Sequence, residues 1–451
     1  MQAHLGPRRA VIFVALAAAL AADVAQPAHA ARVTDIIDSF ERPQEDPVDL
    51  VVEATYAYSA RRGHILREFR CLAHDQAVVG QFCPDGSRIE DARELDVERL
   101  RHVMNLKLRL GIWRSAEFWF ELPLVILDQT RLTYAKGVTP LSSTVDPQGA
   151  DPPPSLFGVP ATGPERAGVG DPRFGVRLTP LSWARDPARA TWALELGLTM
   201  PARPKGGVKQ ADNTSVGEGL WVIDLSTAVS ARPIRQVEPY AGVGGTLRLP
   251  HSNSLFDDYG ATQTLISPGH GINAFVGVEF HPYEDRGREA AFTIDVGGRL
   301  DYTFEGRNYT DLFDALGGST CDARDSASPC TLTTYDRGDI DPSTGRPRKT
   351  DGITDVEQFG TLSTWLGVHY QPVRWVSLSA RLDFAYEMPH FLTSADAGKD
   401  LDGRNQVQAS NSSGVNEFNP VYDSHIDSLG SRFRTGGIRT VGFSLSLSGK
   451  F

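Results

Sequence analysis

The sequence predicts an all-β fold, a transmembrane antiparallel up-and-down β-barrel of about 12 strands. Three observations predict it: long stretches of alternating apolar and polar residues, connections that are alternately short and long, and an N-terminal leader for export. Alternation with a period of two indicates β-strands, because successive side chains leave opposite faces. In hydrocarbon every backbone polar group needs an internal partner, so strands can span a membrane only as a closed barrel.

An N-terminal leader precedes the predicted barrel. Arg8 and Arg9 come before an apolar stretch at 10–22, and Pro27-Ala28-His29-Ala30 follows it. A basic region, an apolar region and small residues in this order are typical of a secretory signal peptide, and the apolar stretch is too short to anchor in a bilayer. We therefore expect cleavage after Ala30 and export of the mature chain.

The expected cleavage divides the chain into three parts. Residues 1–30 form the signal peptide, and residues 48–451 form the barrel. Residues 31–47 lie between them and are either a periplasmic N-terminal extension or a short plug that enters the lumen from below. Both alternatives are compatible with a segment that mixes apolar, acidic and proline residues.

The clearest alternation runs from Leu100 to Ile112. Leucine, methionine and isoleucine dominate one parity, whereas arginine and lysine dominate the other. A helix would spread these basic residues around its whole surface, so the stretch is predicted as a strand. The same pattern predicts about twelve strands, near 48–60, 97–113, 116–129, 169–181, 189–201, 219–232, 235–249, 270–282, 289–305, 355–371, 373–388 and 435–451.

The connections between these strands alternate in length. Three of them are only two or three residues long: Arg114-Ser115, Arg232-Pro233-Ile234 and Gln371-Pro372-Val373. Short turns at one rim and long loops at the other are typical of transmembrane barrels, and an even number of strands returns both termini to the periplasmic side. The long polar connections span roughly 61–96, 130–168, 202–218, 250–269, 306–354 and 389–434.

Aromatic residues gather near the ends of the predicted strands. Tryptophan and tyrosine favour the two membrane–water interfaces, because each ring has an apolar body and a polar group. We therefore expect aromatic belts that include Trp113, Trp119, Trp192, Trp221, Trp375, Tyr56, Tyr58 and Tyr370.

The C-terminal sequence carries a more specific signal. Val441, Phe443, Leu445 and Leu447 alternate with small polar residues, and the chain ends on Phe451. This segment resembles the last strand of Gram-negative outer-membrane barrels. The resemblance implies that the barrel-insertion machinery reads Phe451, and that the protein is an integral, multi-pass protein surrounded by outer-membrane lipid.

A second resemblance covers about 168–232. Gly168-Val169-Gly170-Asp171, then Leu196-Gly197-Leu198-Thr199-Met200-Pro201 and the polar loop before Trp221, are similar to the barrel family linked to the meta pathway of phenol degradation. Ala202 departs from the Thr-Gly that this family has after the proline. The proteins of that family are presumed outer-membrane transporters, which implies a transport role here.

Charged residues fall on the parity opposite to the apolar residues and are predicted to line the lumen. Twelve strands enclose a bore between the filled eight-stranded barrels and the open 16-stranded ones, so charges of both signs would leave a narrow pore. Alternatively, they form a salt-bridged lumen that only neutralises buried charge. The candidates are Arg99, Arg101, Lys107, Arg109, Glu121, Glu195, Asp295, Arg299, Arg381 and Asp383.

Composition and motifs exclude several other functions. The formal net charge is −11, from 45 basic and 56 acidic residues, which argues against binding to nucleic acid. No sequence pattern typical of a metal site, a cofactor site or a catalytic triad occurs. His251-Ser252-Asn253 is similar to the His-x-Ser-Asn of twelve-stranded outer-membrane phospholipases, but adjacent strand residues point to opposite faces. We therefore expect no enzyme, no cofactor and no metal.

Three functions follow, in decreasing order of support. The first is passive transport, or a channel, for a small solute. The second is a structural or surface-interaction barrel without transport, because the six outer loops are long. The third is a barrel lipid hydrolase.

The four cysteines lie in two of the long loops. Cys71 and Cys83 belong to the first loop, and Cys321 and Cys330 belong to the fifth. A barrel assembled in the oxidising periplasm is expected to pair each cysteine with its neighbour in sequence. Each disulfide would close a small ring and stiffen the tip of its loop.

Overall fold

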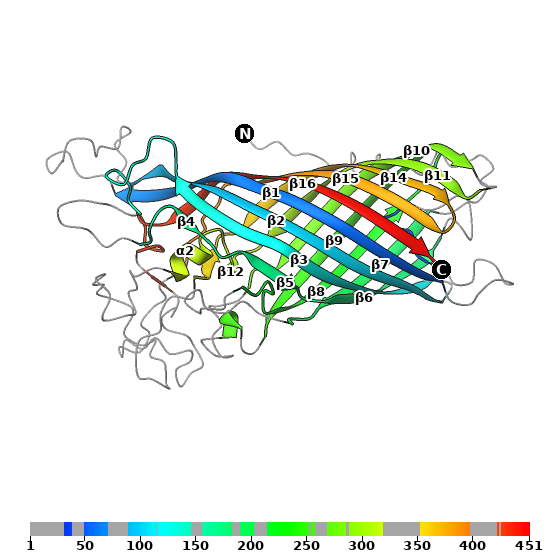
Figure 1. The fold of residues 1–451 in the computed structure, drawn as a ribbon, viewed down its shortest axis with the longest axis horizontal. Helices are drawn as coiled ribbons and strands as arrows, with labels where there is room; N and C mark the ends of the chain where they lie inside the picture. The colour runs from blue at the N-terminus through cyan, green and yellow to red at the C-terminus, as the bar shows by residue number, and fades with distance from the viewer. Residues whose placement is uncertain are drawn as a thin grey trace, which may run out of the picture.

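A computed structural model gives the three-dimensional structure (Figure 1). It describes residues 31–37, 49–70, 89–113, 115–145, 156–182, 190–202, 214–251, 254–257, 268–285, 288–318, 352–396, 422–423 and 425–451. Cys71, Cys83, Cys321, Cys330 and the predicted signal peptide lie outside these residues.

Twelve antiparallel strands form one closed barrel. Neighbours along the wall are also neighbours along the chain, and β1 closes the barrel by pairing with β16 from Val51↔Lys450 to Arg67↔Phe433. The strands are β1 (Leu50–Arg70), β2 (Ile89–Trp113), β3 (Ala116–Tyr134), β6 (Arg173–Leu181), β7 (Thr191–Thr199), β8 (Leu220–Ser230), β9 (Val237–Pro250), β10 (Gly271–Asp285), β11 (Ala290–Thr303), β14 (Phe359–Val373), β15 (Val376–Glu387) and β16 (Phe433–Lys450).

The outer surface of the barrel is apolar. Leu225 and Val276 are more than half exposed, and so are Leu196, Val243, Ile272, Leu382, Val441 and Leu447. A closed band of exposed apolar side chains is unfavourable in water and favourable against lipid tails. The predicted fold class, a transmembrane antiparallel β-barrel of about 12 strands, is therefore confirmed. No helix among the described residues is long and apolar enough to cross a membrane.

The two ends of the barrel differ. The short turns β2–β3, β8–β9 and β14–β15 lie at one end, together with both termini of the barrel, and we call this the periplasmic end. The opposite end, with the long connections, is the outer end. There β1 and β2 continue about ten residues beyond the predicted strand limits, because their hydrogen-bonded ladder extends from Leu50↔Leu110 to Arg70↔Ile89. Polar residues interrupt the alternation in this part, which explains why sequence periodicity missed it.

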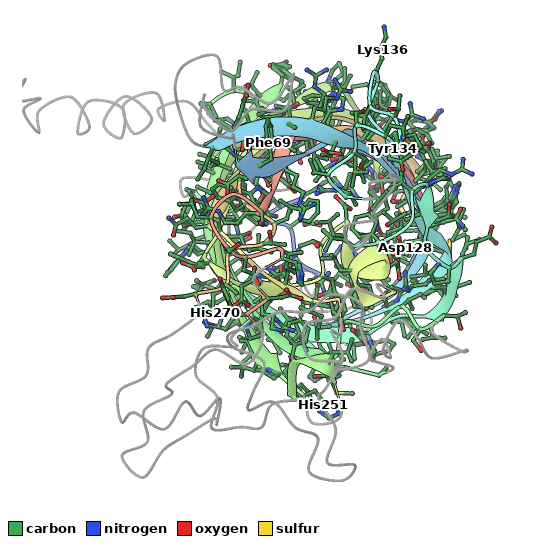
Figure 2. The ribbon with its side chains drawn as sticks, turned by 90° about the vertical axis from the view of Figure 1, so that its left-hand side faces the viewer. Phe69, Asp128, Tyr134, Lys136, His251 and His270 are labelled. Carbon is green, nitrogen blue, oxygen red and sulfur yellow. The ribbon has the colours of Figure 1, made fainter. Side chains whose placement is uncertain are left out.

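Smaller elements occupy the outer end. They are β4 (Ala161–Thr162) and β5 (Arg166–Val169), which pair with β3, the 3₁₀ turn η1 (Leu255–Asp257), the helix α2 (Phe313–Gly317), and the paired strands β12 (Gly306–Asn308) and β13 (Thr354–Val356). In the view onto this end, the short helix α2 lies inside the ring of strands (Figure 2).

An apolar cluster fills part of the lumen at the outer end. Inner-face residues of the wall, such as Leu95 and Leu132, pack against loop residues such as Leu316 and Leu392. We call this set the outer cluster: Ile65, Leu95, Val97, Leu132, Val145, Leu156, Phe157, Leu312, Ala315, Leu316, Leu392, Ile426, Phe433 and Ile438. Burial of apolar surface therefore holds the inward-folded loops against the wall.

Four aromatic side chains lie flat against glycines on the inner face. A Cβ at Gly175 would lie 2.7 Å from Trp119 Cζ2, and one at Gly277 would lie 2.9 Å from Tyr240 Cε2. Phe275 covers Gly242 and Trp365 covers Gly297 in the same way. The prediction that Trp119 belongs to an aromatic belt is wrong, because it points into the lumen and is 2% exposed. Trp192, Tyr370 and Trp375 are exposed near the periplasmic end.

We predict a large difference between two adjacent glycine substitutions. Gly297→Ala would place a Cβ 2.6 Å from Trp365 Cε2, and displacing this ring breaks the hydrogen bond that Trp365 Nε1 donates to Asp295 Oδ2 at 2.7 Å. Overpacking of this kind destabilises by about 1–3 kcal/mol. Gly298→Ala is the matched control, because its nearest neighbour, Ser363 O, lies 3.5 Å away. Urea unfolding in lipid vesicles measures both variants, and equal stabilities would contradict the prediction.

Candidate functional site

All ten charged residues predicted to line the lumen lie on the inner face of the wall. Arg381 and Asp383, for example, alternate with Leu382 and Phe384, whose side chains are exposed on the lipid side. Arg299 alternates in the same way with the lipid-exposed Leu300. Within the part of the wall whose outer face is apolar, the charged side chains of the described strands therefore lie on the inner face, which is the candidate site.

Two arginines of β2 share one carboxylate near the outer end. Arg99 donates to both oxygens of Asp128, each at 2.7 Å. Arg101 lies farther away, with its Nε 3.8 Å from Asp128 Oδ2. The planar guanidinium group of arginine suits such bidentate pairing with a carboxylate, so Asp128 fixes the orientation of the Arg99 side chain. Arg101 stays nearly half exposed.

A cationic and aromatic group follows at mid-height. Lys107 Nζ lies 3.8 Å from Glu121 Oε2 and 4.9 Å from the centre of the Trp119 ring. Arg173 Nη1 lies 3.9 Å from the other oxygen of Glu121, and its guanidinium lies 6.0 Å from the same ring. Both cations therefore lie near the negative face of one indole.

Two buried ion pairs lie nearer the periplasmic end. Arg109 donates to Glu117 from Nε at 2.8 Å and from Nη2 at 2.7 Å. Arg177 donates to Glu195 from Nε at 2.8 Å and also from Nη2. Each carboxylate therefore has its own arginine, which offsets the cost of removing both charges from water.

The opposite wall carries pairs within single strands. Arg299 donates to Asp301 at 2.7 Å, and Arg381 donates to Asp383 at 2.7 Å. Residues two apart in a strand share a face, which is why these pairs form. The remaining carboxylate, Asp295, accepts hydrogen bonds from neutral donors, Tyr240 Oη at 2.6 Å and Trp365 Nε1 at 2.7 Å.

Solvent exposure divides the lumen into three levels. At mid-height the side chains of Arg173, Arg299 and Arg381 are 42–45% exposed although they face inward. Near the periplasmic end Glu117 is 1% exposed, and at the outer end Asp311 is 2% exposed. Arg101, nearer the outer end, is 45% exposed as well. We interpret these inward-facing exposed charges as a solvated middle section that lies between two more densely packed ends.

Residues 31–37 pack across the lumen at the periplasmic end. Ala31 O accepts from Thr34 N at 2.7 Å and from Asp35 N at 2.8 Å, so the segment forms one turn. Thr34 Oγ1 lies 2.8 Å from Ser230 Oγ of β8, and Ile37 N donates to Glu117 Oε2 of β3 at 2.9 Å. The turn thus touches distant parts of the wall.

Both arginines of the buried ion pairs also hold this segment. Asp35 O accepts from Arg109 Nη2 at 3.3 Å and from Arg177 Nη1 at 3.1 Å. Arg109, which the sequence assigned to the lumen, and Arg177 therefore both bind a segment of the same chain. We call residues 31–37 the inner segment.

An ion-pair network ties the loops to the wall at the outer end. Arg61 of β1 donates to both oxygens of Glu387, at 2.8 and 2.9 Å, and to Asp311 at 3.0 Å. Arg166 of β5 donates to both oxygens of Asp314 in α2, at 2.9 and 2.6 Å. Helix α2 and the residues before it are therefore fixed by charge as well as by the outer cluster.

Two titratable groups of the outer loops are perturbed by burial. Burial lowers the pKa of His390, whose ring stacks on Phe359 with the ring centres 4.0 Å apart. Burial raises the pKa of the Asp427 carboxyl, which also accepts hydrogen bonds from Ala395 N and Asp423 N. Both groups are buried in the segments between β15 and β16, so we assign both to the packing of the loops.

Catalytic and metal sites have little support. His251 lies at the end of β9, where its ring meets Trp221 edge-on, while Ser252 and Asn253 lie outside the described residues. Among the described residues, no group of three or more His, Cys, Asp or Glu is placed to hold a metal ion.

Sequence reasoning missed several partners within the site. Asp128 and Asp311, which pair with Arg99 and Arg61, lie in stretches predicted as a strand end and a loop. One signal in the sequence could have revealed which aromatic residues point into the lumen. It is a glycine on one strand opposite a tryptophan or tyrosine on the next strand, as in Gly297↔Trp365.

Comparisons with known proteins concern the fold. No protein-family model and no curated protein matches the sequence. An outer membrane channel from Pseudomonas putida F1 is 12% identical, with 90% of this chain and 97% of that chain covered and a TM-score of 0.42. A FadL homologue from Pseudomonas aeruginosa is 10% identical (89% and 90% covered, TM-score 0.30). An anion-selective porin from Comamonas acidovorans is 9% identical (90% and 98% covered, TM-score 0.25).

Proposed function

We propose that the protein is a channel for small polar solutes across the outer membrane, and that the inner segment restricts it at the periplasmic end. The observation that carries the proposal is the solvated middle section, where inward-facing arginines keep almost half of their surface exposed. A barrel that only needed to neutralise its interior would bury these groups in pairs, as it does at both ends.

The charge pattern supports small solutes that carry charge or strong dipoles. Cations and carboxylates alternate around the middle section, from Lys107 and Glu121 to Arg381 and Asp383. Such a field favours polar solutes over apolar ones. The rings of Trp119 and Trp365 add flat surfaces, each already beside a cation. A bulky solute would have to displace these groups.

Ion selectivity tests the proposal. Asp301→Asn combined with Asp383→Asn would leave Arg299 and Arg381 without their carboxylates in the solvated section. We expect the reversal potential of the channel in a planar bilayer, under a salt gradient, to shift toward anion selectivity, because the wall becomes more positive.

A matched variant controls for general effects of lost charge. Glu98→Gln removes a carboxylate on the outer face of β2, opposite to the lumen. Glu98 pairs there with Arg62 of β1, and both side chains are at least 40% exposed. It should leave the reversal potential unchanged. A wild-type barrel without conductance, or a double variant with unchanged selectivity, would contradict a channel through this section.

A structural barrel without transport is the second candidate function. It is favoured by the close packing of both ends among the described residues, where the outer cluster and the inner segment contact the wall. The absence of any conductance, together with normal growth and a normal outer membrane permeability on deletion of the gene, would favour it over the channel.

Membrane insertion is proposed to depend on Phe451. Its backbone pairs with Leu50 at the strand junction that closes the barrel, with N–O distances of 2.8 and 3.0 Å. Its side chain is 68% exposed at the periplasmic end. This position supports recognition by the barrel-insertion machinery.

A further inference from the structure

The backbone nitrogen of Ala31 lies in a buried acidic site. Ala31 N donates to Glu238 Oε1 of β9 at 2.5 Å, and Arg32 N donates to Glu279 Oε1 of β10 at 2.8 Å. Ala31 is 0% exposed, Glu238 2% and Glu279 3%. Two carboxylates therefore converge on the first turn of the inner segment, where water does not reach them.

These two carboxylates lack the cation that the neighbouring ones have. Glu117 and Glu195 each pair with an arginine, whereas no lysine or arginine among the described residues forms an ion pair with Glu238 or Glu279. His281 is the nearest basic group, with Nε2 at 3.6 Å from Glu238 Oε2 and 3.9 Å from Glu279 Oε2.

Two atoms of this site have no hydrogen-bond partner among the described residues. They are Glu238 Oε2 and His281 Nε2, both fully buried. A buried carboxylate is strongly unfavourable unless it is paired with a cation and hydrogen-bonded. The site thus lacks a positive charge to neutralise its carboxylates and N–H donors for its unpaired oxygen. A cation at the position of Ala31 N would supply both.

Removal of the leader would create that positive charge at the same atom, Ala31 N. The small residues Ala28 and Ala30 of the leader predict hydrolysis of the Ala30–Ala31 peptide bond. In this reaction water adds OH to the Ala30 carbonyl carbon, and Ala31 N takes the hydrogen and, near neutral pH, a second proton. A neutral amide with one N–H becomes an ammonium group with three.

We propose that Ala31 is the mature N-terminus and that its α-ammonium group binds the Glu238–Glu279 carboxylate pair inside the lumen. Signal-peptide cleavage then does more than release the chain, because it creates the cation that docks the inner segment. Two independent features, the leader motif and the acidic site in the wall, point to the same atom. The inference does not depend on which solute crosses the barrel.

Chemical protection of the α-amine tests this inference directly. The protein is purified folded from outer membranes, its intact mass is measured, and it is treated with an acetylating N-hydroxysuccinimide ester near neutral pH. We expect an intact mass that corresponds to a chain beginning at Ala31. We also expect the α-amine to react slower than in the unfolded protein by about tenfold or more, because the two carboxylates favour the unreactive ammonium form and because burial of Ala31 keeps the reagent away from it.

Two variants and one control separate docking from folding. Glu238→Gln combined with Glu279→Gln should raise the labelling rate to that of the unfolded chain. Insertion of one alanine between Ala30 and Ala31 should do the same while keeping both glutamates, since it moves the amine out of the site. Asp301→Asn combined with Asp383→Asn removes two other lumen carboxylates and should leave the α-amine protected.

Each remaining outcome would overturn the inference. A mature chain that begins at another residue places the amine elsewhere. An α-amine that reacts equally fast in folded and unfolded wild-type protein is not buried. Equal protection in the wild type and in the folded one-alanine variant, with folding checked by heat-modifiable gel migration, means that the carboxylates do not bind the amine. Because none of these measurements involves conductance, their failure is distinct from failure of the proposed channel.

Discussion

Replacement of Arg61 by methionine is expected to detach the loops at the outer end from the barrel wall. Methionine keeps much of the side chain's length but leaves Glu387 and Asp311 without their shared cation, and the Asp311 side chain is only 2% exposed. Removing one partner of a buried ion pair costs about 3–5 kcal/mol. We expect the lower end of this range, because Arg61 itself is 24% exposed.

The expected consequence is local rather than global. The strand ladder of β1 does not depend on the Arg61 side chain, whereas the two residues that it binds lie before α2 and at the end of β15. The variant should therefore still form a heat-modifiable barrel, and the loops before α2 should become more sensitive to protease added from outside the cell.

The neighbouring residue provides a matched control. Arg62 pairs with Glu98 by a hydrogen bond of 2.8 Å, but its side chain is 70% exposed. Exposed pairs contribute about 0–1 kcal/mol, so Arg62→Met should leave the protease pattern unchanged. Equal sensitivity of the two variants, or no change in either, would show that the Arg61 network does not hold the loops.

The strands of the barrel could be predicted from the sequence because lipid and lumen impose opposite polarity on alternate residues. Leu382 and Arg381 illustrate this: the first is lipid-exposed and the second lies in the lumen, as their parity predicts. The pattern weakens where the wall leaves the membrane. At Arg61–His64 both faces meet polar groups, so nothing in the sequence marks the continuation of β1.

The partners within the lumen could not be predicted, because they depend on contacts across the bore. Trp119 resembles an interface residue by its position near a strand end, yet it covers Gly175, its register partner on the neighbouring strand β6. Arg109 was predicted as a lumen charge, but its donation to the backbone oxygen of Asp35, which also accepts from Arg177, was not predicted. Periodicity assigns a residue to a face and does not assign its partner.

The second large effect concerns the inner segment. Deletion of residues 31–37 removes the turn that bridges Glu117, Ser230 and Glu238, three wall residues on separate strands. We expect a several-fold larger single-channel conductance. The reason is that the lumen between these strands is filled by the backbone of the segment and not by side chains of the wall. The remaining strands keep all their ladder partners, so the variant should fold.

A point variant controls for changes at the same segment. Asp35 contributes its backbone carbonyl to Arg109 and Arg177, so Asp35→Asn keeps both hydrogen bonds. Its conductance should equal that of the wild type. Heat-modifiable migration on a gel verifies that each variant is a folded barrel before recording.

The measurement that tests the central claim most directly is the single-channel conductance of the wild type, Asp35→Asn and the 31–37 deletion in the same planar bilayer. A solvated lumen restricted by the inner segment predicts a small conductance for the first two and a several-fold larger one for the deletion. Identical conductance in all three folded barrels would contradict the claim that residues 31–37 restrict the channel.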